Sequence, residues 1–124
     1  MNSAWDQAEC YRYAKDYVLP DPKNVLEIGC GTLVKQHKFF FENGFQGKYF
    51  CIDQESAFQT AAQIGLNLQT VQAMVVDLEG ELSELTKFLC NDENRVKTIL
   101  CFDVIEHLYN PSGLLDMVKN ISKK

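Results

Sequence analysis

The stretch that decides the fold is "VLEIGCGTL", Val25 to Leu33, an apolar run that ends in two glycines. Glycines let the backbone turn sharply and approach a ligand closely. A helix that begins beyond them would offer unpaired N–H groups. The stretch therefore predicts a buried strand whose carboxyl end carries a tight binding loop. The alternative is a structural turn that only joins the strand to a helix.

Outward from this stretch, apolar runs of strand length alternate with helical periodicity. The elements predicted, in chain order, are a helix at 4–18, a strand at 24–29, a helix at 34–43, a strand at 48–53, a helix near 58–65, a strand at 71–77, a helix near 82–89, a strand at 97–102 and a helix from 110 onward. Such alternation requires parallel strands, since each helix returns the chain to the same end of the sheet. We therefore expect an α/β fold whose ligand site lies beyond the carboxyl ends of the strands.

The ends of two helices carry their own signals. Gly44 follows the second helix and is expected to close it as a C-terminal cap. In the last helix, Asn110 is the predicted N-cap and Pro111 the first helical residue. Four residues of that helix are expected on its buried face: Leu114, Leu115, Val118 and Ile121.

Composition narrows the class of protein. The 124 residues, 46% hydrophobic and 23% charged, are expected to form a single globular domain over 1–124. Residues 1–22 would supply a helix and a linker, and 23–124 the core. No run approaches the eighteen or so apolar residues of a membrane span, and the formal charge of −5 makes nucleic-acid binding unlikely.

The cysteines do not form a recognisable disulfide or metal-binding pattern. Five are present, and no pair has C-x-x-C spacing, so neither a disulfide framework nor a zinc site is predicted. With no secretory leader pattern in the first residues, a cytoplasmic location is expected.

The glycine loop favours a positively charged ligand over a dinucleotide. The dinucleotide fingerprint G-x-G-x-x-G needs a third glycine, and that position is Val34. Glu27, two residues before Gly29, would repel a pyrophosphate but suits a cationic amino group. A nicotinamide-dependent oxidoreductase is therefore disfavoured.

Two more acids end predicted strands. Asp53 follows Gly29 by 24 positions, close to the spacing of about 20 residues at which a second-strand acid accepts hydrogen bonds from ribose hydroxyls. Asp77 ends the third strand, and its carboxylate could accept from an exocyclic amino group such as that of adenine. For both residues the alternative is that the carboxylate only caps the following segment.

Four segments, "VLEIGCGT", "YFCID", "VVDLEG" and "CFDVIEHLYNP", occur in an order and spacing that resemble class I S-adenosylmethionine-dependent methyltransferases. The resemblance covers about residue 24 to the end of the chain and implies a three-layer, Rossmann-like, mainly parallel sheet of strand order 3-2-1-4. The residues it assigns to S-adenosyl-L-methionine are Glu27, Gly29, Cys30, Gly31, Asp53, Gln54, Asp77, Leu78, Phe102 and Asp103.

The resemblance also implies a role for each part of this set. The residues of the first loop surround the methionine part, Asp53 holds the ribose, and Asp77 with Leu78 meets the adenine. The loop near Phe102 and Asp103 closes over the methionine end. One departure is Leu33, since the family often has glycine at this position, and we interpret it as a narrower loop.

The segment "DVIEH" supplies the candidate catalytic residues. If it is helical, Asp103, Glu106 and His107 share one face. In some methyltransferases similar segments bind magnesium, and in others they serve only the fold. We predict His107 and Glu106 as the proton-accepting pair and no metal.

The chain ends early for the family it resembles. Such proteins normally continue into a fifth strand, so the predicted domain is truncated after the helix that follows the fourth strand. The fourth strand would then be an exposed apolar edge. A methyltransferase acting on a small-molecule acceptor is the first hypothesis. The second is an inactive interaction module whose fourth-strand edge binds a protein partner or a second copy.

Overall fold

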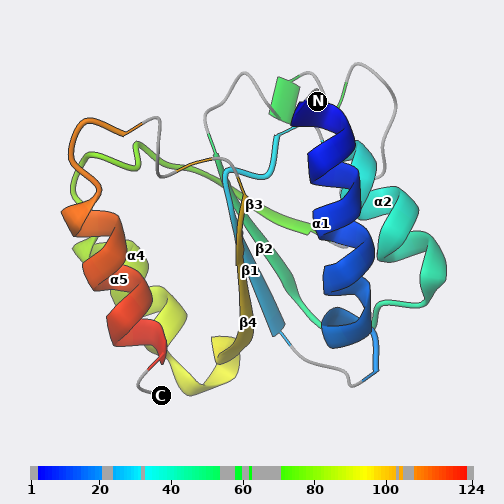
Figure 1. Cartoon of the computed structure of the whole chain (residues 1–124). Helices are drawn as coiled ribbons and strands as arrows, with labels where there is room; N and C mark the ends of the chain where they lie inside the picture. Colours follow the sequence, from blue (N-terminus) through cyan, green and yellow to red (C-terminus); the bar gives the residue numbers. More distant parts are fainter. Residues whose placement is uncertain are drawn as a thin grey trace.

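A parallel sheet of four strands, ordered β3-β2-β1-β4, forms the middle layer of the computed structural model (Figure 1). The structure describes residues 3–20, 24–31, 33–53, 58–59, 62, 71–102, 104 and 108–122, with side chains from residue 8 onward. The strands are β1 (Asn24–Ile28), β2 (Tyr49–Asp53), β3 (Val71–Val75) and β4 (Val96–Cys101). The predicted fold class and strand order are confirmed.

Helices cover both faces of the sheet. They are α1 (Ser3–Val18), α2 (Val34–Phe39), α4 (Ser83–Cys90) and α5 (Ser112–Ser122), with short 3₁₀ turns η1 (Phe41–Asn43) and η2 (Asp92–Asn94). Helices α1 and α2 lie on one face, and α4 and α5 on the other (Figure 1). Residues 58–59 and 62 are helical, while the rest of the helix predicted near 58–65 lies outside the described residues.

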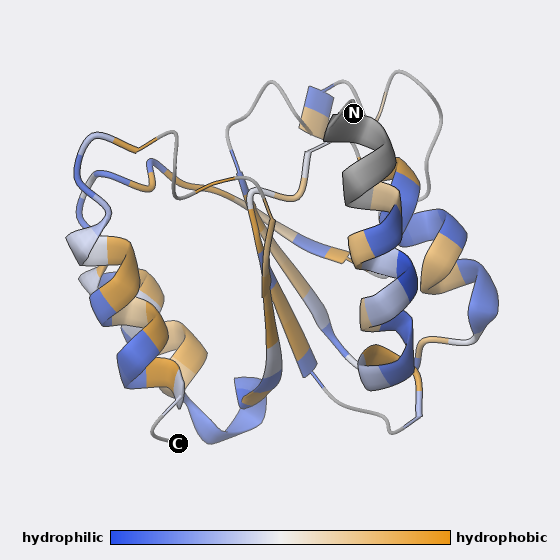
Figure 2. Cartoon of the chain, viewed as in Figure 1, coloured by the Kyte–Doolittle hydropathy of each residue, from blue (hydrophilic) through white to orange (hydrophobic). Residues whose placement is uncertain are grey.

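Side chains alternate along the strands, so each face has its own core (Figure 2). The α1/α2 face buries Tyr11, Ala14, Val18, Val25, Cys30, Leu33, Phe39, Phe40, Tyr49, Cys51, Val71 and Leu100. The α4/α5 face buries Leu26, Ile28, Phe50, Ile52, Leu82, Leu89, Leu114, Met117 and Ile121. Within the described part of the chain, no helix is long and apolar enough to cross a membrane.

The helix predicted at 34–43 is shorter than expected. Helix α2 ends at Phe39, and the chain continues through the turn η1. Gly44, which was predicted to cap the helix, instead closes η1 with φ +89°, and Phe40 is the C-cap of α2.

Helix α5 differs from its prediction in two details. It begins at Ser112, after Pro111, although the Asn110 side chain does accept from the Ser112 N–H at 3.1 Å. Leu115 was predicted to be buried, but it is 47% exposed, and Met117 is buried in the core instead. Positions 114, 117 and 121 follow the three- and four-residue steps of one helix face, and 115 falls beside it.

Strand β4 forms one edge of the sheet, as predicted. Hollows lie on both of its faces. A cavity of about 590 Å³ separates it from α5, where Ile99, Leu115 and Val118 contribute to the lining. A second cavity, of about 440 Å³, lies between β4 and α1 and is lined in part by Tyr13 and Phe102.

Candidate functional site

The loop after β1 adopts the conformation that its glycines predict. Gly29 and Gly31 both have positive φ, +71° and +64°, a region that L-residues with side chains rarely adopt. A Cβ on Gly29 would stand 2.3 Å from Val104 Cγ2, so that position is also closed sterically. A Cβ on Gly31 would meet nothing within 4 Å. The backbone of Gly31 therefore borders open space in which a ligand can approach it.

Leu33 completes the loop in the same left-handed conformation, with φ +67°. It is 1% exposed and precedes the first residue of α2. A left-handed non-glycine residue costs about 1–2 kcal/mol. The family resembled often has glycine here, and the backbone keeps the glycine-like conformation although the residue is leucine. Burial of the side chain in the α1/α2 core offsets this strain.

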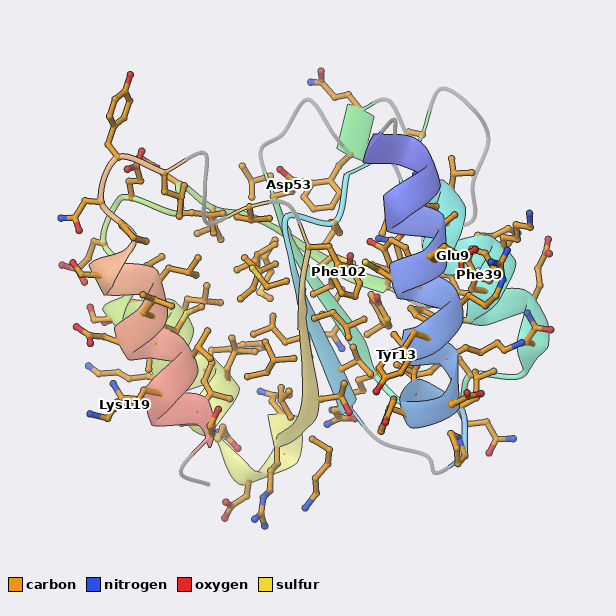
Figure 3. All side chains as sticks on the ribbon, viewed as in Figure 1. Glu9, Tyr13, Phe39, Asp53, Phe102 and Lys119 are labelled. Carbon is orange, nitrogen blue, oxygen red and sulfur yellow. The ribbon has the colours of Figure 1, made fainter. Side chains whose placement is uncertain are left out.

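Asp53 holds this loop against β2. Its Oδ2 accepts from the Gly31 N–H at 2.7 Å, and the Gly29 N–H donates to the Ile52 carbonyl at 2.8 Å. The Asp53 carbonyl accepts from the Val76 N–H at 3.0 Å, which brings the end of β3 to the same place. Asp53 and Phe102 lie close to the carboxyl edge of the sheet (Figure 3). The structure thus brings together three of the segments that the sequence singled out.

Glu27 lies behind the loop and not on its surface. Its side chain is fully buried, and its carboxylate accepts from the Tyr11 and Tyr49 hydroxyls and from Gln36 Nε2. The sequence had suggested a carboxylate that meets the ligand directly. In the structure, Tyr11 and Gln36 line the cavity beside the loop, and they lie between that cavity and Glu27. A direct contact of Glu27 with the cofactor stays a prediction.

Gln36 is a site residue that sequence reasoning missed. It is 1% exposed, and its Nε2 lies 2.7 Å from Glu27 Oε1, 3.0 Å from the Tyr11 hydroxyl and 2.8 Å from the Cys30 carbonyl. It therefore links the loop to the buried acid. We name the four side chains of Tyr11, Glu27, Gln36 and Tyr49 the Glu27 cluster.

Burial dominates the electrostatics of the Glu27 cluster. Burial, with a smaller contribution from the nearby Asp53 charge, raises the pKa of Glu27 to about 7 against the opposing effect of the three hydrogen bonds. Burial and the Glu27 charge raise the pKa of both Tyr11 and Tyr49 well above the ordinary value. Near neutral pH, Glu27 therefore exchanges a proton while the tyrosines keep theirs.

A cavity of about 120 Å³ adjoins the loop. Its lining consists of Tyr11, Gly29, Cys30, Gly31, Leu33, Lys35, Gln36 and Phe102. Phe102 packs edge-on against Tyr11, with ring centroids 5.0 Å apart, and it also borders both cavities beside β4. Cys30 is buried and contributes its carbonyl to the Gln36 amide. The predicted residues Gly29, Cys30, Gly31 and Phe102 thus border one cavity.

The predicted adenine pair lies after β3. Asp77 is exposed, and its Oδ1 accepts from the Glu79 N–H at 3.0 Å, which is the local capping that the sequence left open as the alternative. Leu78 is half-buried against the α4/α5 core. Contact of either residue with a nucleobase stays a prediction.

Four predicted site residues, Gln54, Asp103, Glu106 and His107, lie outside the described residues. Among the residues that are described, no group of three or more His, Cys, Asp or Glu side chains is placed to hold a metal ion.

Comparison with known proteins agrees with this geometry. A family described as a methyltransferase domain matches residues 6–124. None of the curated proteins matches the chain.

Three solved structures share the fold. A SAM-dependent methyltransferase from Aquifex aeolicus is similar at a TM-score of 0.65 and 22% identity, over 92% of this chain and 57% of that one. The putative methyltransferase in complex with the Trm112 activator of Haloferax volcanii has a TM-score of 0.61 and 14% identity, over 95% and 54%. The plantazolicin methyltransferase BpumL, in complex with SAH, has a TM-score of 0.58 and 18% identity, over 90% and 39%. The chain therefore spans between about two-fifths and three-fifths of the length of these proteins.

Proposed function

The chain belongs to the methyltransferase domain family, and from this we propose that it is the cofactor-binding part of an S-adenosylmethionine-dependent methyltransferase. The observation that carries the proposal is the bond from the Gly31 N–H to Asp53 Oδ2 beside open space at Gly31. This hydrogen bond joins the glycine loop that follows β1 to the carboxylate at the end of β2. Such a pair suits a ligand that combines a ribose with a cationic chain.

The residues present fit this cofactor. The Gly31 backbone accommodates close approach, because it has no side chain to displace and a Cβ there would meet nothing within 4 Å. Asp53 offers charged acceptor atoms for a ribose diol, where each hydrogen bond contributes about 1.5–3 kcal/mol. No phosphate has to be neutralised, which agrees with the buried acid Glu27 behind the loop.

The part played by the protein would be positioning. The bound cofactor supplies a methyl group on a sulfonium, and transfer requires an acceptor atom in line behind that methyl. The loop and Asp53 would fix the cofactor, while Phe102 and Tyr11 form an aromatic wall that excludes water. His107 and Glu106 remain the proposed proton acceptors, because they follow closely on Phe102, which lines the cavity.

The proposed acceptor is a small molecule. The cavity of about 440 Å³ beside α1 is of a size that suits one, and Phe102 borders both it and the loop cavity. Aromatic residues of α1, Tyr13 and Tyr17, contribute to its lining. All five cysteines are free thiols, as expected in a reducing compartment, and this supports a cytoplasmic location for the reaction.

Calorimetry with S-adenosylhomocysteine tests the proposal. The wild-type chain is expected to bind, and Asp53→Asn, which keeps an acceptor for the Gly31 N–H but loses the charge, to bind about tenfold more weakly. Asp53→Ala, which loses both, should bind weakest. Asp116→Asn on the exposed side of α5 is the control and should bind like wild type. Absence of binding by folded wild-type protein would overturn the proposal.

A second candidate, a partner-binding module, rests on the edge strand. β4 is an edge strand of the described sheet, and a cavity lies on each of its faces. Leu115→Glu, at an exposed position beside the larger cavity, should then abolish association in sedimentation, and Lys119→Glu on the exposed surface of α5 should not. A wild-type chain that is monomeric and binds S-adenosylhomocysteine would favour the first candidate.

A further inference from the structure

We propose that Tyr11 relays the charge of the buried Glu27 to the cavity beside the Gly29–Gly31 loop, so that a ligand ammonium binds there with release of a proton from Glu27. The inference rests on the proposed function for the identity of the ligand. It adds a positioning role for Tyr11 and a proton linkage that the family assignment does not contain.

The hydrogen bonds of Tyr11 place it between the acid and the cavity. Its hydroxyl donates to Glu27 Oε2 and accepts from Gln36 Nε2 at 3.0 Å, and Tyr11, which is 5% exposed, is part of the lining of the 120 Å³ cavity. Glu27 itself is fully buried and is not among the residues that line that cavity. Any ligand in the cavity therefore meets the acid through Tyr11 or Gln36.

A tyrosine hydroxyl has one hydrogen and can both donate and accept, so its direction depends on the acid. When Glu27 is ionised, the Tyr11 hydrogen points to the carboxylate. The Tyr11 oxygen can then accept from a ligand in the cavity if the two Gln36 hydrogens go to their nearer acceptors, Glu27 Oε1 and the Cys30 carbonyl. When Glu27 carries a proton on Oε2, that proton can donate to Tyr11, and the Tyr11 hydrogen must turn away from the acid. Only the first arrangement offers an acceptor to an ammonium group.

Gln36 stays a donor in both arrangements. Its amide has two hydrogens, and three acceptors lie within 3.0 Å of the nitrogen: Glu27 Oε1, the Tyr11 oxygen and the Cys30 carbonyl. The same amide also donates to the Cys30 carbonyl in the loop. A change in the protonation of Glu27 can therefore alter the hydrogen bonding of the loop. The cavity, the loop and the acid thus share one network.

Burial and the Asp53 charge favour the protonated Glu27, while the three hydrogen bonds that it accepts favour the ionised form. From α1 it faces Tyr11, from β2 it faces Tyr49, Cys51 and Asp53, and the loop places Cys30 nearby. Burial raises the pKa of Tyr11, Tyr49 and the Cys51 thiol, so these groups add no charge near pH 7, whereas Asp53 adds a like charge. Lys35, from α2, lines the cavity on the ligand side. Burial and Asp53 raise the pKa of Glu27 to about 7, and a ligand cation would lower it.

The proton balance of the step is simple. A protonated Glu27 and a ligand ammonium give an ionised Glu27, a bound ammonium and one proton that passes to the solvent. No bond other than O–H is broken. Below pH 7 the binding reaction must therefore release a proton, and affinity falls as pH falls.

Calorimetric titration of the full chain with S-adenosylhomocysteine measures this release directly. Titrations at pH 6.0, 7.0 and 8.0 in two buffers of different ionisation enthalpy give the number of protons released per ligand. We expect the number of protons released per ligand to be close to one at pH 6.0, about one half at pH 7.0 and close to zero at pH 8.0. The Kd should be roughly tenfold larger at pH 6.0 than at pH 8.0.

Two variants locate the proton. Glu27→Gln, which has the same shape and no titration, should bind with no proton release and a Kd that is flat with pH. Tyr11→Phe keeps the acid but removes the relay, so binding should weaken and proton release should fall. Thermal melting shows whether each variant is folded, and if one is not, the other still decides.

A ligand without the ammonium is the matched control. 5′-Methylthioadenosine keeps the nucleoside and the sulfur but lacks the amino-acid part, so its binding should release no proton in any variant. Failure of wild type to bind either ligand would overturn the proposed function. Binding of S-adenosylhomocysteine without proton release, or with equal release in Glu27→Gln, would overturn the relay and leave the proposed function intact.

Discussion

The two faces of the sheet use the same strands but bury different chemistry. Leu26 and Ile28 of β1 join an apolar core under α4 and α5, while Val25 and Glu27 point to α1 and α2. Among the described residues, the buried polar side chains are Glu27 and Gln36, both on the α1/α2 face. Figure 2 shows the apolar strands between these two helix layers.

The difference separates packing from ligand binding. The α4/α5 face is held by close contact of apolar side chains, whose energy does not depend on pH. The α1/α2 face carries hydrogen bonds that continue into the Gly29–Gly31 loop. A substitution on the first face should therefore change stability alone. A substitution on the α1/α2 face should change the stability together with its pH dependence or with ligand binding.

The largest expected effect is on the apolar face. Phe50 is fully buried there and packs edge-on against Phe88 with centroids 5.8 Å apart. Phe50→Ala is expected to lower the free energy of unfolding by about 3–5 kcal/mol, because it leaves a cavity that the sheet cannot close. Guanidinium denaturation at pH 5.5 and 8.0 should give the same loss at both.

Tyr109 supplies the control for this experiment. It is 100% exposed, so Tyr109→Ala should change the free energy of unfolding by less than about 0.5 kcal/mol. A loss in Phe50→Ala that depends on pH would show that the two faces are not separate in the way proposed.

The next effect belongs to the polar face. The pKa of Glu27 is raised to about 7 in the folded chain, above its ordinary value, so the folded state keeps a proton that the unfolded chain loses. The stabilisation by this proton is complete at low pH and is lost as pH rises to about 7. The loss is about 3 kcal/mol. Glu27→Gln cannot titrate and should lack it.

Denaturation of wild type and Glu27→Gln from pH 4.5 to 8.0 gives the difference between the two proteins. The difference should grow in favour of the variant by about 3 kcal/mol across this range. Other carboxylates titrate in both proteins and cancel. A difference that stays constant with pH would mean that folded and unfolded chains bind the Glu27 proton equally, so that the pKa of Glu27 is not raised by folding.

Much of the fold could be predicted because it rests on local patterns. The apolar runs gave the four strands, and their alternation with helices gave the parallel sheet, since a crossover permits little else. The glycines of the loop were informative because Gly29 and Gly31 need positive φ. The end of α2 was not predicted, since Phe41 continues the apolar run of Phe39 and Phe40 and neither glycine nor proline occurs before Gly44.

The site was harder to predict because it depends on contacts between distant residues. Asp53 was found through its place at the end of a strand. Glu27 was found too, but its partners Tyr11 and Tyr49 were not, because they lie 16 positions before it and 22 after it. Gln36 did carry one signal: it lies three and four residues before the buried Phe39 and Phe40, which places a polar side chain on an apolar helix face.

A smaller effect is expected at Gly29, where the loop packs against Val104. An alanine there must keep φ near +71° and place its Cβ 2.3 Å from Val104 Cγ2. The backbone strain costs about 1–2 kcal/mol, and overpacking adds about 1 kcal/mol or more. Gly29→Ala should therefore lower the free energy of unfolding by about 2–3 kcal/mol in urea denaturation. A loss below 1 kcal/mol would mean that Val104 moves aside freely.

The smallest effect on stability, and the sharpest separation of packing from binding, is expected at Gly31. A Cβ there has φ +64° but meets nothing within 4 Å, so Gly31→Ala should lower the free energy of unfolding by only about 1 kcal/mol. The same Cβ would occupy the open space beside the loop, and S-adenosylhomocysteine should bind at least tenfold more weakly in calorimetry.

Gly44 is the matched control, because it has the same left-handed conformation, with φ +89°, and equal room, but it caps η1 and lines none of the three cavities described. Gly44→Ala should lose a similar stability and no affinity. Equal loss of affinity in both variants would assign the effect to general strain. Loss in Gly31→Ala alone would locate ligand binding on the face of the sheet that buries the acid.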